Sequence, residues 1–231
     1  MKIYGLQKMT LLDYPGKIAA TVFTTGCNFR CPWCHNASLV LNTKLPPIIS
    51  EADFFTFLEK RRGWLDGVCI TGGEPLLQKD LPEFIEKIKN LGFLVKLDTN
   101  GSFPEKLKEL VNRKLVDYVA MDIKNSPAKY GATVNLPSGK EFLPKIQESL
   151  SFLLENHVEY EFRTTLVREF HSLDDLKEIA HWIQGAQHYY LQNFEDSGDL
   201  IQSGFKAFTK NELEEIVFTL NSLLPHVELR N

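Results

Sequence analysis

The sequence lacks long hydrophobic runs, an excess of basic residues and a second group of cysteines. No stretch of the chain approaches the ~18 apolar residues that cross a bilayer, so we expect no contact with a membrane. Lys and Arg number 26 against 30 Asp and Glu, a balance that disfavours nucleic acid as a partner. The first residues hold no apolar core of signal-peptide length, and we therefore expect a cytoplasmic protein.

Cysteine is scarce, and three of the four cysteines lie within eight positions. Cys27, Cys31 and Cys34 follow the spacing C-x3-C-x2-C in the stretch "TGCNFRCPWCHNAS", whereas Cys69 stands alone in the apolar run "GVCIT". Crowded cysteines in a reducing compartment are typical of metal binding or redox chemistry rather than of disulfides. Cys69 is interpreted as a buried, inert thiol.

Short apolar runs alternate with longer amphipathic segments, which predicts six units of a strand followed by a helix. The predicted strands are 17–23, 67–71, 93–99, 117–123, 158–167 and 188–194. The predicted helices are 50–63, 80–92, 102–114, 140–156, 172–185 and 210–224. The length allows one domain, 1–231, to bury a sizeable core. Such units predict parallel strands in either an open doubly wound sheet or an incomplete barrel.

Two of the predicted helices carry recognisable start signals. Ser50 is expected to cap the helix that follows it, with Asp53 three residues later. Asp80 and Glu83 are spaced like a capping box at the start of the next helix. These signals support the placement of both helices.

Polar or glycine-rich groups follow all six predicted strands. The cysteine loop follows the first strand, and the later strands end at "TGGEP" (71–75), "DTNG" (98–101), "MDIK" (121–124), "FRTT" (162–165) and "QNF" (192–194). Both candidate architectures place ligands beyond the carboxyl ends of parallel strands. The pattern therefore predicts a single ligand site at this edge of the sheet.

The cysteine spacing favours an iron–sulfur cluster over structural zinc. Structural zinc prefers four closed ligands, usually in two separated pairs, and the only distant cysteine is Cys69. Coordination by Cys34 and the adjacent His35 together would be strained. A four-iron cluster held by three thiolates leaves one iron open for chemistry. A zinc-stabilised binding module without catalysis remains the alternative from a different class.

The loop "CNFRCPWC" followed by "GGEP" resembles the radical S-adenosylmethionine (radical SAM) superfamily. With "LLDYPGKIAATVF", "DTNG", "MDIK" and "FRTT", the chain is similar to activating enzymes of glycyl radical enzymes, and among them to anaerobic ribonucleoside-triphosphate reductase activating proteins. The resemblance runs from Leu11 to about Phe194. It implies an α/β fold with a partial (β/α)6 TIM-like barrel, the radical SAM fold.

The resemblance also implies roles for individual residues. Cys27, Cys31 and Cys34 would ligate three irons of a [4Fe-4S] cluster, and SAM would chelate the fourth. No side chain would itself be catalytic, because the chemistry belongs to the cluster and SAM. The implied SAM contacts are Trp33 near the adenine and Gly72, Gly73, Glu74 and Pro75 at the amino group. Around the carboxylate and ribose they are Asp98, Thr99 and Asn100. The fourth predicted strand adds Asp122 and Lys124, of which Lys124 would pair with the carboxylate, and the fifth adds Arg163.

The implied activity is reductive cleavage of SAM to methionine and a 5′-deoxyadenosyl radical, which would take a hydrogen atom from a glycine of a partner enzyme. Anaerobic ribonucleoside-triphosphate reductase is the expected partner, and a flavodoxin or ferredoxin is the expected electron donor. The alternatives within the superfamily are activation of another glycyl radical enzyme, such as pyruvate formate-lyase, and action on a small deazapurine precursor. The absence of a further cysteine cluster after residue 69 favours a minimal activator.

Overall fold

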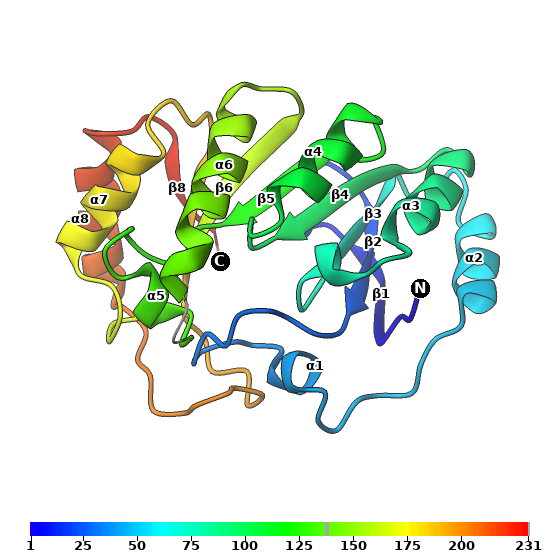
Figure 1. The fold of residues 1–231 in the computed structure, drawn as a ribbon, viewed down its shortest axis with the longest axis horizontal. Coiled ribbons are helices and arrows are strands. Elements are labelled where there is room, and N and C mark those ends of the chain that lie inside the picture. The colour runs from blue at the N-terminus through cyan, green and yellow to red at the C-terminus, as the bar shows by residue number, and fades with distance from the viewer. Residues whose placement is uncertain (137–138, 231) are drawn as a thin grey trace.

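The computed structural model describes residues 1–136 and 139–230, and its centre is an eight-stranded sheet in which the strands follow chain order (Figure 1). The strands are β1 (Gly5–Thr10), β2 (Ala19–Thr24), β3 (Gly67–Gly72), β4 (Leu94–Thr99), β5 (Tyr118–Asp122), β6 (Glu159–Leu166), β7 (Tyr189–Asn193) and β8 (Val227–Arg230). Strand β1 is antiparallel to β2, and every later pair is parallel.

The strand order decides between the two predicted architectures. The order of a doubly wound sheet reverses at a switch point, whereas here each strand pairs with the next one in the chain. A sheet wound in a single direction curls into a barrel. Because β1 and β8 do not pair within the described residues, the barrel stays open, which confirms the expected partial TIM-like barrel.

The longer helices form an arc outside the strands (Figure 1). They are α2 (Glu51–Glu59), α3 (Leu81–Asn90), α4 (Pro104–Asn112), α6 (Leu143–Leu154), α7 (Leu173–Trp182) and α8 (Lys210–Asn221). In α3, Leu81, Phe84, Ile85 and Ile88 fall at helical spacing and are buried. The main core therefore lies between the convex face of the sheet and this helical layer. Among the described residues, every helix is too short or too polar to cross a lipid bilayer.

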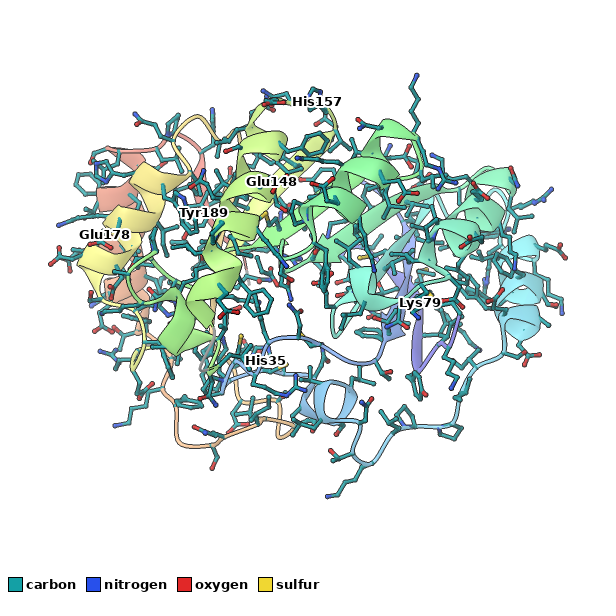
Figure 2. The ribbon with its side chains drawn as sticks, in the orientation of Figure 1. His35, Lys79, Glu148, His157, Glu178 and Tyr189 are labelled. Atoms are coloured by element: carbon teal, nitrogen blue, oxygen red, sulfur yellow. The ribbon has the colours of Figure 1, made fainter. Side chains whose placement is uncertain are left out.

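Two short helices lie near the cysteine loop, at the end of the barrel where the parallel strands finish. They are α1 (Ala37–Leu41) and α5 (Tyr130–Thr133). The side chain of His35 lies at this end, while Glu148, His157 and Glu178 lie in the outer part of the molecule (Figure 2). The cysteine loop is thus set apart from the charged helical surface.

The six predicted strands and six predicted helices are all present, with ends that shift by a few residues. Strands β1 and β8 were missed, because both are largely exposed edge strands without an apolar run. Ser50 caps α2 as expected and accepts from the N–H of Asp53 at 3.0 Å. The capping role of Asp80 was wrong: its side chain makes no cap hydrogen bond, and its carboxylate lies 2.8 Å from the N-terminal ammonium.

The concave face of the barrel carries charged side chains that are held in pairs. Glu161 is fully buried, and its two oxygens accept from Arg230 at 2.7 and 2.8 Å. Tyr118 donates to the same carboxylate at 3.0 Å, and the Arg230 guanidinium lies 3.6 Å from the centre of the Tyr190 ring. A buried carboxylate is tolerated only with such partners. This pair anchors the last strand to the inside of the barrel.

Replacement of Arg230 with Ala should lower the unfolding free energy by about 3 kcal/mol, since the buried Glu161 loses its bidentate partner. This loss lies at the lower end of the range for broken buried ion pairs, because the Tyr118 hydroxyl still donates to Glu161. Urea unfolding measures the effect. Arg113→Ala, which removes exposed pairs with Glu86 and Glu109, should stay close to wild type. Equal losses in the two variants would contradict the anchoring role.

Candidate active site

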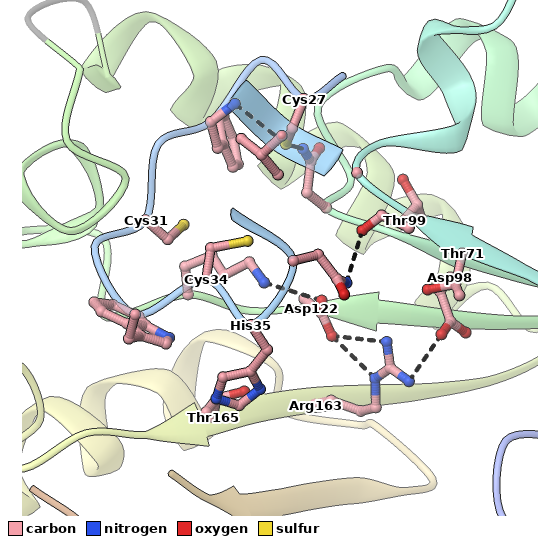
Figure 3. A pocket seen from close by; sticks show the side chains of 18 of the residues that line it. Cys27, Cys31, Cys34, His35, Thr71, Asp98, Thr99, Asp122, Arg163 and Thr165 are labelled. Atoms are coloured by element: carbon pink, nitrogen blue, oxygen red, sulfur yellow. Dashed lines mark hydrogen bonds and ion pairs between the residues drawn. The ribbon is translucent and has the colours of Figure 1, made fainter. Parts of the chain in front are cut away.

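One cavity at the carboxyl edge of the sheet brings the cysteine loop together with the ends of the strands (Figure 3). Its volume is about 220 Å³, which is room for a group larger than a single ion. Of the predicted site residues, those that line it are Cys27, Cys31, Trp33, Cys34, Gly72, Gly73, Asp98, Thr99, Asn100, Asp122, Lys124 and Arg163. The predicted convergence of strand ends therefore exists as a single cavity.

Glu74 and Pro75 are predicted site residues that do not line this cavity. Glu74 is fully buried, and its oxygens accept from the Thr99 hydroxyl at 2.9 Å, the Asn100 N–H at 2.7 Å and the Leu76 N–H at 3.1 Å. Burial raises the pKa of Glu74 to about 7, although these donors lower it. Glu74 is therefore a brace between two loops rather than an open acceptor for an ammonium group.

The glycines after β3 allow two loops to touch. A Cβ on Gly73 would lie 1.9 Å from the carbonyl oxygen of Gly26, and a Cβ on Gly72 would lie 2.3 Å from that of Thr24. The backbone N–H groups of Gly73 and Glu74 donate to these same two carbonyls, at 3.1 and 2.8 Å. The sequence suggested close approach of a ligand at these glycines. In the structure, glycine is required here for a second reason: the backbone of the cysteine loop comes too close to leave room for a Cβ atom.

The three clustered cysteines line the cavity as free thiols (Figure 3). Burial raises the pKa of Cys27 to about 11 and that of Cys31 to about 12, and it also raises the pKa of Cys34. Such thiols become stable thiolates when a positively charged group binds among them. Cys69 is also buried but lies outside this cavity, in β3.

The three clustered thiols suit an iron–sulfur cluster. Within the described residues, no three His, Cys, Asp or Glu side chains converge so as to hold one metal ion. Zinc needs all of its ligands within about 2.3 Å of one point, whereas a four-iron cluster takes each thiolate on a separate iron. Three cysteine thiols that line one cavity therefore fit the cluster.

Charges of both signs lie on one side of the cavity. Arg163, only 12% exposed, donates to Asp122 at 2.9 Å and to Asp98 at 3.3 Å (Figure 3). Lys124 donates to the other oxygen of Asp122 at 2.9 Å. Burial would raise the pKa of Asp122, but Arg163 and Lys124 outweigh it and lower that pKa to about 2. Two cations and two anions suit a ligand that itself carries both charges.

His171 braces the site, a role that its position in the sequence did not suggest. Its Nδ1 faces the N–H of Val167 at 3.1 Å, and its Nε2 lies 2.9 Å from the carbonyl oxygen of Lys124. Because an N–H can only donate, we assign the proton to Nε2, which then donates to Lys124. The Trp33 ring lies 5.8 Å from His171 and 4.5 Å from Phe170. No spacing pattern in the sequence marks this contact.

Several further residues line the cavity without having been assigned individually. They are Phe29, His35, Asn36, Val40, Thr71, Thr165 and Gln192. Thr71, Thr165 and Gln192 belong to strand-end stretches that the sequence did single out. Alternation of side chains along a strand places Thr165 on the same face as Arg163.

Comparison with known proteins agrees with this geometry. The model of the radical SAM superfamily matches residues 21–183. A Methanocaldococcus jannaschii protein provisionally named a glycyl-radical enzyme activating enzyme is 35% identical over 99% of this chain and 95% of its own length. A 7-carboxy-7-deazaguanine synthase of Thermoplasma acidophilum is 29% identical over 68% and 70%. The pyruvate formate-lyase-activating enzyme of Listeria monocytogenes is 34% identical over 56% of each chain.

A solved structure shares the fold. A radical SAM methyltransferase from Sphaerobacter thermophilus matches 96% of this chain and 68% of its own, with a TM-score of 0.71 and 14% identity. The likeness concerns the fold alone and agrees with the open barrel described above.

Gly73→Ala should separate the two loops, because the new Cβ meets the backbone of Gly26. We expect a stability loss of about 2–3 kcal/mol and reduced iron loading after anaerobic reconstitution, measured by thermal unfolding and iron analysis. Gly63 has a positive φ of 78°, unlike Gly73, and nothing lies within 4 Å of its Cβ position. Gly63→Ala should therefore cost about 1 kcal/mol and keep full iron loading. Full loading in both variants would argue against the loop contact.

His171 should make metal-free protein less stable in mild acid. Burial lowers its pKa below the usual 6.5, so the unfolded chain takes up this proton first as pH falls. Its contribution is complete above about pH 6.5 and is lost as pH drops toward the lower folded pKa. Urea unfolding between about pH 5 and 7.5 should show a weaker pH dependence in His171→Gln than in wild type. Identical pH dependence in the two proteins would refute this assignment.

Proposed function

Because the chain belongs to the glycyl-radical enzyme activating enzymes of the radical SAM superfamily, we propose that it generates a glycyl radical on anaerobic ribonucleoside-triphosphate reductase. The family uses a [4Fe-4S] cluster and SAM as cofactors. The observation that carries the proposal is the single cavity in which three thiols meet paired charges of both signs. A [4Fe-4S] cluster held by Cys27, Cys31 and Cys34 would supply the electron for reductive cleavage of SAM to methionine and a 5′-deoxyadenosyl radical, and that radical would take a hydrogen atom from the target glycine.

We assign the cluster to Cys27, Cys31 and Cys34. Cys31 is buried, Cys27 and Cys34 are half-buried, and all three thiols share one cavity. Their raised pKa values favour the neutral thiols unless a cationic group binds. The loop that carries them is held in place by the glycine contact and by Glu74. Three protein ligands leave one iron for SAM, in keeping with the open position of catalytic metal sites.

The amino acid end of SAM is assigned to the charged side of the cavity. Lys124 and Arg163 suit the carboxylate, while Asp98 and Asp122 suit the ammonium group. Backbone atoms of Gly72 and Gly73 complete this end, and Thr99 suits the ribose. Glu74 and Pro75 support this end from behind the wall.

The adenine is assigned to Trp33, whose ring is fixed by its neighbours. Trp33 is 4% exposed, and its ring packs against Phe170 and His171. Together with buried Phe29 it gives part of the wall an apolar surface, which excludes water from a reactive carbon radical. The residues of the chain thus position and shield the reactants.

The choice of partner rests on motif resemblance. The named relatives include enzymes that act on pyruvate formate-lyase and on a deazaguanine precursor, so these remain the competing substrates. We propose a flavodoxin or ferredoxin as electron donor, the cytoplasm as location and one domain spanning 1–231.

Anaerobically reconstituted and reduced protein should release 5′-deoxyadenosine from SAM, measured by chromatography. Cys31→Ala should abolish this release, because one cluster ligand is missing. Cys69→Ala should keep most of it, because that thiol lies outside the cavity. Zinc in place of iron and sulfide, or equal loss in both variants, would refute the assignment.

The same reduced protein then tests the partner. Mixed with SAM and anaerobic ribonucleoside-triphosphate reductase, it should yield a glycyl radical detectable by EPR. Pyruvate formate-lyase and a deazapurine precursor serve as parallel substrates. A radical on pyruvate formate-lyase alone, or turnover of the small molecule alone, would replace the proposed partner while leaving SAM cleavage intact.

A further inference from the structure

The asparagine after β4 directs its amide at a cysteine of the cluster loop rather than into open space. The Nδ2 atom of Asn100 lies 3.7 Å from Sγ of Cys27 and 3.0 Å from Oδ1 of Asn28. The first distance is longer than an N–H···O bond and suits the larger sulfur atom. Asn100 is only 6% exposed. Asn100 therefore contacts a proposed cluster ligand directly.

The orientation of this amide follows from its other partners. Its Oδ1 faces the backbone N–H of Ser102 at 2.9 Å and the Ser102 hydroxyl at 2.6 Å. A backbone N–H can only donate, so the atom facing it must be the oxygen. The NH2 group must then face Cys27. If the amide were flipped, its NH2 group would face the N–H of Ser102, which is also a donor, and its oxygen would face Cys27 in place of the NH2 group.

A closed ring of hydrogen bonds holds the amide in place. Asn100 donates to Asn28, Asn28 donates to Ser102 at 2.8 Å, and Ser102 donates back to Asn100. The backbone N–H of Asn100 is fixed separately by Glu74 at 2.7 Å. All four hydrogen-bonding positions of the amide are thus used. This degree of restraint is more than a loop asparagine needs for packing.

We propose that Asn100 is a positioning residue that tunes the reduction potential of the cluster through an N–H···S hydrogen bond to Cys27. The inference rests on the proposed function, because it requires Cys27 to ligate the cluster. Reduction adds an electron to a cluster that already bears thiolates. A donor aimed at a ligand sulfur stabilises the added charge and raises the potential. Asn100 thereby makes the cluster easier to reduce.

The test compares midpoint potentials of the full-length, anaerobically reconstituted protein. Asn100→Ala should keep its iron and sulfide but shift the midpoint to a more negative value, measured by EPR-monitored redox titration without SAM. Asn36→Ala is the matched control, since Asn36 also lines the cavity but its amide donates to the carbonyl oxygen of Gly72 at 3.1 Å. The control should keep the wild-type midpoint.

Each outcome has a separate meaning. Equal midpoints in wild type and Asn100→Ala overturn the inference, while release of 5′-deoxyadenosine by wild type leaves the proposed function standing. A wild-type protein that binds no cluster overturns both. If Asn100→Ala cannot hold a cluster, pulsed EPR on protein labelled with ¹⁵N in the asparagine side chains replaces it. A nitrogen coupling that persists in both Asn28→Ala and Asn36→Ala supports Asn100 as the donor, and its absence overturns the inference.

Discussion

The whole site depends on one buried carboxylate. Glu74 ties the turn after β3 to the end of β4 through the Thr99 hydroxyl and the Asn100 N–H, and its own N–H reaches the cysteine loop at the carbonyl of Gly26. A buried carboxylate is stable only while its donors stay in place. The contacts of Glu74 therefore form as a set, and they bring together three segments that are far apart in the sequence.

Charge balance is the second constraint, and it follows from the polar interior of the barrel. Closed barrels of this class fill their interior with branched apolar side chains, whereas β6 carries Glu161 and Arg163 on its inner side. Each meets opposite charge, Glu161 from Arg230 and Arg163 from Asp98 and Asp122. The pairing offsets the cost of burial. It also leaves groups of both signs at the edge where a zwitterionic ligand would bind.

The sequence predicted most of the fold because six strands and six helices carry clear apolar periodicity. Periodicity alone could not predict the winding, since doubly wound sheets and barrels share the same units and differ only in long-range strand order, and the barrel was predicted from the resemblance to the radical SAM superfamily. Strands β1 and β8 lack the apolar run that marks a buried strand. Motif spacing located the site, but it could not show that Glu74 turns away from the cavity or that Asn100 turns toward Cys27, because both orientations are set by tertiary hydrogen bonds.

The side chain of His171 explains how the cysteine loop and the segment that follows β5 keep their relative position. The ring supports the carbonyl of Lys124 from one side and the Trp33 ring from the other. The Lys124 ammonium is fixed in turn by Asp122. A shift of Trp33 would therefore press on His171 and, through it, on the backbone that carries Lys124. The aromatic residue assigned to the adenine and the lysine assigned to the carboxylate are thus connected through one buried side chain.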